Sequence, residues 1–204
     1  MAAVFQLYQQ AIDQGLIELA PSTVVTVRSA HKMMAATEIA DGRRFGDIRL
    51  SRLTWQDIEY LYAAMRTRGC SSAYVRRCAT VLARSLELAR KRGLIDSNPS
   101  KDAARPRTSR TKPFAPTSDE VRAVLAGAQR RDAEIADAAK ILASTGMRRG
   151  EFLALRWGDI ALDIGEIHVA AAISDGGPGV GVVRKKTKKS DWRDVPLTSA
   201  AVEA

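Results

Sequence analysis

A basic segment that contains three prolines interrupts the chain near its middle and limits how the chain can fold. Residues 100–116 contain few apolar side chains, so they cannot build a core and favour an extended linker. We therefore expect one domain over residues 1–99 and a second domain over residues 117–204. The linker could lie along a phosphate backbone or serve only as a soluble hinge. Its candidate DNA-binding residues are Arg107, Arg110 and Lys112.

The composition is that of an ordinary folded protein. Of the 204 residues, 46% are hydrophobic and 27% are charged. No apolar run reaches the roughly 18 residues of a membrane helix and no signal sequence opens the chain, so we expect a cytoplasmic protein without a membrane partner. Cys70 and Cys78 belong to no CxxC pattern or Cys/His cluster. We therefore expect no disulfide framework, no metal and no cofactor.

The positive charge of the chain favours a polyanionic partner. The sequence has 32 Lys and Arg against 23 Asp and Glu, which gives a formal net charge of +9. Such an excess is typical of proteins that bind nucleic acid. Many basic proteins bind none, however, so the positions of the charges along the chain have to decide the question.

Hydrophobic periodicity predicts helices almost throughout residues 1–99. The first is expected over residues 4–18, and the second begins at an N-cap, Ser22 or Thr23, and runs to about residue 40. Thr54 is expected to cap a third helix, with Asp57 in its first turn. A fourth begins after Ser71 or Ser72 and ends near Gly93.

The fourth predicted helix combines an apolar face with a basic stripe. Arg77, Arg84 and Lys91 recur every seven residues and so lie nearly in line, with Arg76 and Arg90 beside them. These five residues are candidates for contacts with DNA. The alternative is a solvated helix face, which basic residues decorate routinely.

The second half of the chain changes from helical to alternating patterns. Thr117 and Glu120 form a capping box that starts a helix, and further helices are expected over residues 135–144 and 150–157. From residue 167 onward, alternation predicts a small antiparallel sheet. Its three strands are expected over residues 167–171, from residues 180–183 onward, and over residues 192–197.

Residues 145–160 read TGMRRGEFLALRWGDI and resemble the first catalytic box of the tyrosine recombinases, the phage integrase family. The TGxRxGE core, the following LxLxWxDI pattern and the hairpin downstream occur in the order typical of that family. Similarity extends upstream to about Ser22, through Gly46-Asp47-Ile48, the basic helix and Asn98-Pro99. The resemblance implies a mainly α, helical core-binding domain of the SAM-like type, followed by a truncated α+β catalytic domain with a small antiparallel sheet.

By the same resemblance, Arg148 grips the phosphate at which DNA is cleaved. Strand exchange passes through a pentavalent phosphate whose extra negative charge needs fixed cationic donors, and a guanidinium can hold two phosphate oxygens at once. Gly146 and Gly150 would allow a tight turn and a close backbone approach to the phosphate. Glu151 is placed to orient or neutralise neighbouring basic groups.

The hairpin over residues 182–197 resembles the family's second and third strands, whose turn carries a catalytic lysine. An ammonium there can protonate the departing 5′ hydroxyl. Lys186 is the first candidate, and Lys188 competes because the loop is about one residue longer than the family pattern. Lys185 and Lys189 are DNA-binding candidates, although a merely solvated turn would also be rich in lysine.

The family pattern would continue with a His-x-x-Arg box and a tyrosine nucleophile. Neither His31 nor His168 is followed by arginine three residues later, and all four tyrosines lie in the N-terminal half. Two hypotheses follow: a recombinase fragment that contributes to DNA integration, or a noncatalytic DNA-binding protein derived from an integrase. Both predict duplex DNA as partner, and a homo-oligomer on DNA is expected if a complete protein exists. An unrelated RNA-binding accessory factor is a third, weaker alternative.

Overall fold

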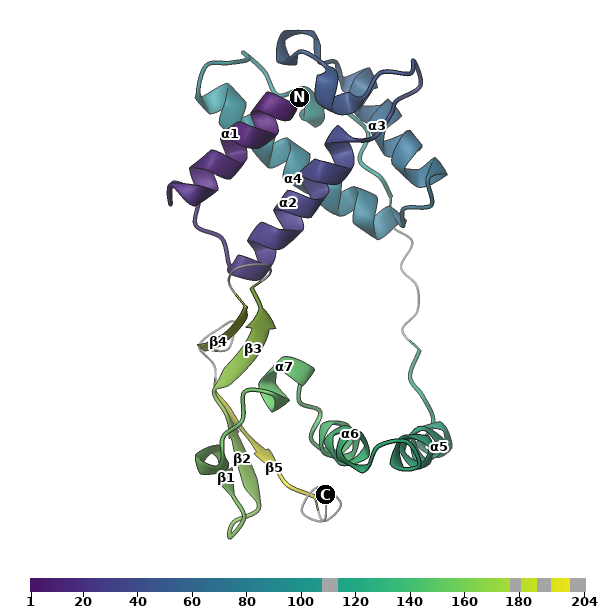
Figure 1. The fold of residues 1–204 in the computed structure, drawn as a ribbon, viewed down its shortest axis with the longest axis vertical. Helices are drawn as coiled ribbons and strands as arrows, with labels where there is room; N and C mark the ends of the chain where they lie inside the picture. The colour runs from purple at the N-terminus through teal and green to yellow at the C-terminus, as the bar shows by residue number, and fades with distance from the viewer. Residues whose placement is uncertain (108–113, 177–180, 187–191, 199–204) are drawn as a thin grey trace. The chain divides into compact units, whose positions relative to one another are not determined.

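The computed structural model describes residues 1–107, 114–176, 181–186 and 192–198. The chain divides into two compact units, residues 1–111 (unit 1) and residues 112–204 (unit 2), which are shown as ribbons in Figure 1. Arg110, Lys112, Lys188 and Lys189 lie outside the described residues, and only the backbone of Lys186 is described.

Over residues 1–107, unit 1 is an assembly of four α-helices with three short 3-10 turns. The helices are α1 (Ala2–Asp13), α2 (Pro21–Ala35), α3 (Trp55–Thr67) and α4 (Ser72–Lys91). The 3-10 turns are η1 (Phe45–Asp47), η2 (Leu50–Arg52) and η3 (Pro99–Lys101). The longest helix, α4, packs against α1, α2 and α3, so it is the element around which this unit is built (Figure 1).

Two of the predicted helix starts in unit 1 are confirmed. The Thr54 hydroxyl accepts a hydrogen bond from the Asp57 backbone N–H, and the Asp57 carboxylate accepts one from the Thr54 N–H. The Ser71 side chain caps α4 by accepting a hydrogen bond from the Tyr74 N–H. Both helices therefore begin where side-chain oxygens satisfy backbone donors that have no partner within the helix.

The predicted start of α2 is wrong, and α1 and α2 are shorter than expected. Ala20, not Ser22 or Thr23, precedes α2, because Pro21 occupies the first turn, where its fixed φ suits a helix and its missing N–H costs nothing. The helix ends at Ala35 because residues 37–45 pair with one another instead, as in the hydrogen bond from the Phe45 N–H to the Thr37 carbonyl.

The core of unit 1 lies around the apolar face of α4. The predicted face residues of this helix are all buried: Val75, Ala79, Leu82, Leu86 and Ala89. The other large, fully buried side chains of this core come from α2, α3 and η1: Met34, Phe45, Ile58, Leu61 and Met65. Because the apolar face of α4 is buried, the basic stripe on the other side of the helix faces solvent.

A buried histidine connects three helices of this core. His31 of α2 forms hydrogen-bond contacts with Gln9 of α1 and Ser85 of α4, at 3.0 Å and 2.9 Å, and its ring stacks on Phe5. Burial lowers the pKa of His31 to about 4. His31 is therefore neutral at physiological pH and serves as a structural residue.

The first part of the expected linker is folded onto unit 1. Ala103 lies in the core at 5% exposure, Pro106 is buried, and the Ala104 N–H donates a hydrogen bond to Glu59 of α3. Asn98 holds the entry to this segment, because its side chain donates to the Ala83 carbonyl and accepts from Ser100. A few small or rigid residues are therefore enough to dock a stretch that is poor in apolar side chains.

Unit 2 contains three helices and two small antiparallel sheets among its described residues. The helices are α5 (Ser118–Gln129), α6 (Ala133–Thr145) and α7 (Arg149–Phe152), and a 3-10 turn, η4 (Trp157–Asp159), follows. The strands are β1 (Ile160–Ala161), β2 (Glu166–Val169), β3 (Ala171–Asp175), β4 (Val182–Lys186) and β5 (Arg193–Pro196). One sheet has the order β1-β2-β5 and the other pairs β3 with β4. The expected fold class, mainly helical with small antiparallel sheets, is confirmed.

The single strand predicted over residues 167–171 is two strands in the structure. The chain leaves the ladder at Ala170, so that β2 pairs with β5 while β3 pairs with β4. Alternating apolar residues continue through the break, and for that reason the pattern could not reveal it. Lys186, which was expected in a turn, is the last residue of β4, and its backbone pairs with Ala171 of β3.

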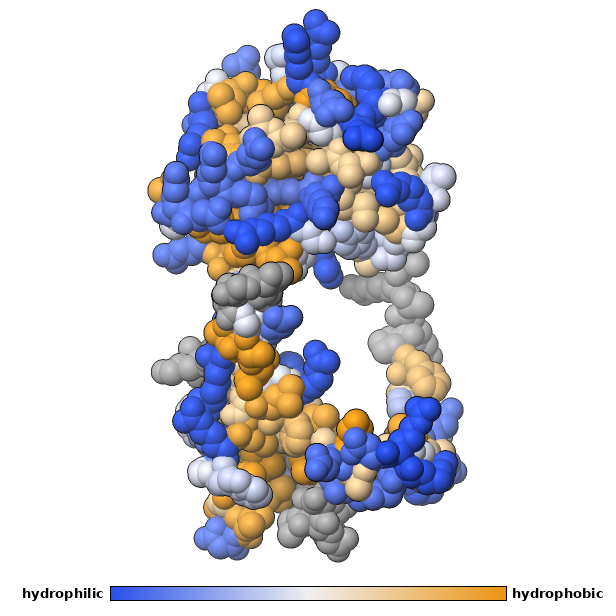
Figure 2. Space-filling model, in the orientation of Figure 1, coloured by the Kyte–Doolittle hydropathy of each residue, from blue (hydrophilic) through white to orange (hydrophobic). Residues whose placement is uncertain are grey.

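Unit 2 buries much less apolar surface than unit 1 among the described residues. Its core consists of Met147, Ile167, Val169 and Val195 with partly buried neighbours. The predicted capping box of Thr117 and Glu120 is confirmed at the start of α5, but this helix buries none of its side chains. Hydrophobic residues consequently reach the surface of unit 2, where Figure 2 shows them in orange.

Candidate active site and nucleic-acid interface

The turn between α6 and α7 positions Arg148. Helix α6 ends at Thr145, and the next residue, Gly146, adopts a left-handed conformation with φ of +64°. The Gly146 N–H donates to the Leu142 carbonyl. Met147 is buried and anchors the turn in the core. Arg148 follows as the residue before α7, with its side chain 81% exposed. The predicted tight turn at Gly146 is thus confirmed.

Glu151 of α7 binds two arginines from different elements. Its carboxylate accepts hydrogen bonds from the Arg148 backbone N–H and from Arg148 Nη1, both at 2.9 Å. Arg193 of β5 donates to both carboxylate oxygens, at 3.2 Å and 2.8 Å, in the bidentate arrangement that guanidinium and carboxylate favour. Glu151 therefore ties the arginine turn to the three-stranded sheet.

The electrostatics of this cluster keep Glu151 ionised. The side chain is 3% exposed, and the hydrogen bonds from Arg193, followed by those from Arg148, lower the pKa of Glu151 to about 2 against the cost of burial. One carboxylate faces two guanidinium groups, so the cluster has an excess of positive charge. Arg148 gives one N–H to Glu151 and presents the rest of its guanidinium to solvent.

Sequence reasoning missed Arg193. The sequence suggested that Glu151 lies next to basic groups but did not identify them. Residues 192–197 were expected only to form the third strand of the sheet. The one sequence feature that could have pointed to Arg193 is its position as a basic residue at the start of the predicted third strand, before Val195-Pro196. The pairing of Arg193 with Val169 in β2 brings it to Glu151, and that register cannot be read from the sequence.

Gly150 makes a close contact within the protein that the sequence did not predict. A Cβ atom at this position would lie 2.6 Å from the Ile173 carbonyl oxygen of β3. Only glycine allows the backbones of α7 and β3 to approach so closely.

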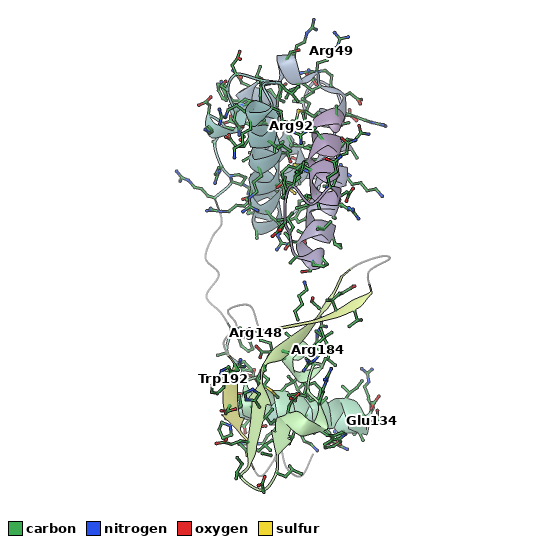
Figure 3. The ribbon with its side chains drawn as sticks, turned by 90° about the vertical axis from the view of Figure 1, so that its left-hand side faces the viewer. Arg49, Arg92, Glu134, Arg148, Arg184 and Trp192 are labelled. Atoms are coloured by element: carbon green, nitrogen blue, oxygen red, sulfur yellow. The ribbon has the colours of Figure 1, made fainter. Side chains whose placement is uncertain are left out.

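Arg184 of β4 contacts the segment that follows α7. Its Nε donates to the Ala154 carbonyl at 3.2 Å, and its Nη2 lies 3.8 Å from Asp159. Figure 3 shows Arg148 and Arg184 on the same side of unit 2, whereas Glu134, in the first turn of α6, lies farther away. The neighbouring candidate Lys185 is partly buried.

His168 of β2 contacts residues at the start of β5. Its Nδ1 lies 2.7 Å from Asp194 on the adjacent strand, and Trp192 lies beside the ring at 5.3 Å between centroids. These cross-strand contacts give His168 a structural role in the sheet.

The basic stripe of α4 is exposed along its whole length. Its residues Arg76, Arg77, Arg84, Arg90 and Lys91 all lie on the solvent side. Arg90 is bound to Glu87, whereas the other four have no ion pair with any described residue. Arg107, farther along the chain, is exposed as well.

Other kinds of site are not found in the described part of the chain. Among those residues, no three or more His, Cys, Asp or Glu side chains are grouped so that they could hold a metal ion. No helix within the same ranges has the length and apolar character needed to cross a membrane.

Comparison with known proteins agrees with this architecture. Residues 116–204 match the model of the phage integrase family. No curated protein sequence matches the chain.

Three solved structures of integrases share the fold. The Tn1549 transposon integrase in complex with a circular intermediate DNA is 21% identical, with a TM-score of 0.75, over 98% of this chain and 62% of that one. A lambda integrase dimer bound to a COC′ core site is 18% identical, with a TM-score of 0.68, over 91% of this chain and 61% of that one. A lambda integrase tetramer bound to a Holliday junction is 17% identical, with a TM-score of 0.73, over 98% of this chain and 52% of that one. The chain thus spans less than two thirds of the structures that it resembles.

Proposed function

We propose that the chain, whose residues 116–204 match the model of the phage integrase family, is part of a site-specific DNA recombinase. In this role it binds duplex DNA at recombination sites and contributes to integration by strand cleavage and rejoining. The location that goes with this function is the cytoplasm, and assembly with further copies on DNA is part of the proposal. The solved integrases with the same fold are described as bound to DNA, as a dimer or as a tetramer in the two lambda structures.

The observation that carries the proposal is the arrangement of Arg148, Glu151 and Arg193. Glu151 fixes the Arg148 backbone and one side of its guanidinium, while the rest of that guanidinium faces solvent. A preorganised cation of this kind can stabilise the charge that develops on a phosphate during cleavage, at little cost in reorganisation. In the proposed mechanism Arg148 therefore binds the phosphate, while Glu151 and Arg193 position it.

A lysine from the end of β4 or from the residues between β4 and β5 completes the proposed chemistry as general acid. Lys186 is the first candidate and Lys188 the second. Either ammonium would protonate the 5′ oxygen as it leaves the phosphorus. The Lys186 backbone lies at the end of β4, the strand that also carries Arg184, and it pairs with Ala171 of β3. Because β3 packs against α7, this position supports a place near α7.

Duplex DNA would contact exposed cations of both units. On unit 1 these are the basic stripe of α4 and Arg107, which have no acidic partner among the described residues apart from the pair of Arg90 and Glu87. Arg110, Lys112, Lys185 and Lys189 are the further candidates. Contacts of this kind attach the protein to the backbone of the duplex, and base contacts must add the specificity.

Selection of a preferred site from a random duplex library tests the binding function. The 204-residue chain should enrich a defined sequence and bind it more tightly than a scrambled duplex of the same length and composition. Equal affinity for both duplexes would contradict site-specific binding. Specific binding without any covalent adduct, even in a longer chain that includes a tyrosine nucleophile, would favour the noncatalytic alternative.

The catalytic roles require a separate experiment in such a longer chain, with a His-x-x-Arg box and a tyrosine downstream. Arg148→Ala should abolish cleavage of a nicked suicide duplex, and loss of the general acid, by Lys186→Ala or Lys188→Ala, should slow it strongly. A 5′-bridging sulfur leaving group departs without protonation, so it should rescue only the lysine variant. Rescue of neither lysine variant would remove both candidates, and full cleavage by Arg148→Ala would overturn the role of the arginine.

A further inference from the structure

A second basic surface lies on unit 1, in the segment between α2 and α3. A hollow of about 670 Å³ is lined there by Arg43, Arg44, Arg49 and Arg52, with Asp47 as the acidic residue among them. None of these arginines belongs to the α4 stripe, to the expected linker or to the cluster around Glu151. The functions proposed above leave this hollow without a role.

The backbone that carries the arginines is firmly anchored. Phe45 and Ile48 point inward and are buried, and between them a Cβ on Gly46 would lie 2.9 Å from the Ala35 carbonyl oxygen of α2. Arg44 and Arg49 directly precede the 3-10 turns η1 and η2, and they are exposed because their neighbours occupy the core. The hollow is thus formed by a segment whose cations need little ordering before they bind a ligand.

The arginines of the hollow differ in whether they already have partners. Arg43 is bound to Asp41 and, at 3.0 Å, to Asp57. Arg44, Arg49 and Arg52 make no side-chain hydrogen bond or ion pair with any residue in the described ranges. Figure 3 shows Arg49 projecting from the surface of unit 1. Three exposed guanidinium groups are therefore available to an anionic ligand.

The lining of the hollow favours a phosphate backbone over a small organic molecule. Pockets for small ligands are lined mostly by apolar and aromatic groups, whereas the apolar side chain here is Ile48, which is itself buried. Guanidinium groups spread along two successive turns suit a row of phosphates, each of which needs only a cation and hydrogen-bond donors.

We propose that Arg44, Arg49 and Arg52 form a DNA-backbone contact separate from the α4 stripe. The contact binds phosphates of duplex DNA and adds affinity without reading the sequence. This inference rests on the proposed function, because it assumes that duplex DNA is the partner, and it extends that function to a surface that no sequence motif indicated.

The test is the salt dependence of duplex binding by the 204-residue chain, measured by fluorescence anisotropy. The variant R44Q/R49Q/R52Q should bind at least tenfold more weakly at about 0.1 M salt. Its slope of log K against log salt should be shallower by roughly 2 to 3, because about 0.9 is lost for each phosphate contact. The corresponding lysine variant should keep most of the slope, since an ammonium still neutralises a phosphate.

Matched variants separate a local contact from a general effect of charge. R122Q/R130Q/R131Q removes the same charge from exposed arginines of unit 2 and should leave the slope within about 1 of the wild-type value. Equal losses in the two triple variants, or an unchanged slope in R44Q/R49Q/R52Q, would overturn the contact while wild-type binding upholds the proposed function. Absence of duplex binding by the wild type would overturn both. Circular dichroism of each variant checks that unit 1 remains helical.

Discussion

Glu151 holds the candidate active site together although it is almost inaccessible to a ligand. Its carboxylate accepts hydrogen bonds from Arg148 and from Arg193, so it connects the turn after α6 to strand β5. A buried charge with two partners is far cheaper than a buried charge with one, because the lost hydration is replaced more fully. The position of Arg148 therefore depends on Arg193, which lies 45 residues farther along the chain.

Replacing Arg193 tests this dependence. Arg193→Met removes the bidentate partner and leaves the Glu151 carboxylate with Arg148 alone, so unit 2 should lose about 1–3 kcal/mol of stability. Arg149→Met is a suitable control, because Arg149 is exposed and makes no ion pair within the described residues. Urea unfolding followed by the fluorescence of the tryptophans in unit 2 measures both. Equal midpoints for the two variants would show that Arg193 does not support the site.

The pH dependence of stability provides a second test of Glu151. The pKa of this carboxyl falls from its ordinary 4.5 to about 2 on folding, so the unfolded chain takes up its proton first as the pH decreases. Glu151 therefore contributes its full stabilisation above about pH 4.5 and loses it between there and about pH 2. The decline in stability over this window should be smaller in Glu151→Gln than in the wild type when urea midpoints are compared. Parallel curves would mean that the carboxyl does not titrate as the geometry requires.

At the scale of elements, the contact between α7 and β3 decides how the arginine turn meets the sheets. Gly150 permits this contact, since a Cβ would lie 2.6 Å from backbone that cannot move independently of β3. Gly150→Ala should destabilise unit 2 by about 1–3 kcal/mol and weaken the function of Arg148. Gly158→Ala is the matched control, because nothing lies within 4 Å of a Cβ there. Thermal unfolding that ranks the two variants equally would contradict the close approach.

The elements that could be predicted are those whose signals are local. Thr54, Ser71 and Thr117 cap their helices through bonds to residues three positions away, and such bonds are visible in the sequence. The break at Ala170 and the partnership of Arg193 with Glu151 depend instead on which strands pair. Strand pairing is set by contacts between distant segments, and neither periodicity nor composition reports it. The docking of Ala103 is missed for the same reason.

At the scale of the whole molecule, two units with similar composition differ in how they bury apolar side chains. Unit 1 has a continuous core from α1 to η3, while Trp157, Phe114 and Val124 of unit 2 are largely exposed. The sequence predicts two parts but not this difference, because apolar periodicity shows which face of a helix is hydrophobic and not what covers it. The net charge of +9, by contrast, is reflected directly in exposed cations on both units.

The salt dependence of duplex affinity tests the central claim, that this chain binds DNA through those exposed cations. If about six phosphates are neutralised, log K for the wild-type chain should fall against log salt with a slope near −5. Replacement of Arg77, Arg84 and Lys91 of the α4 stripe by Gln should make that slope shallower by roughly 3, for the loss of three contacts. Titration by fluorescence anisotropy between about 50 and 200 mM salt gives both numbers. An affinity that does not change with salt, or a stripe variant with the wild-type slope, would contradict the proposed interface.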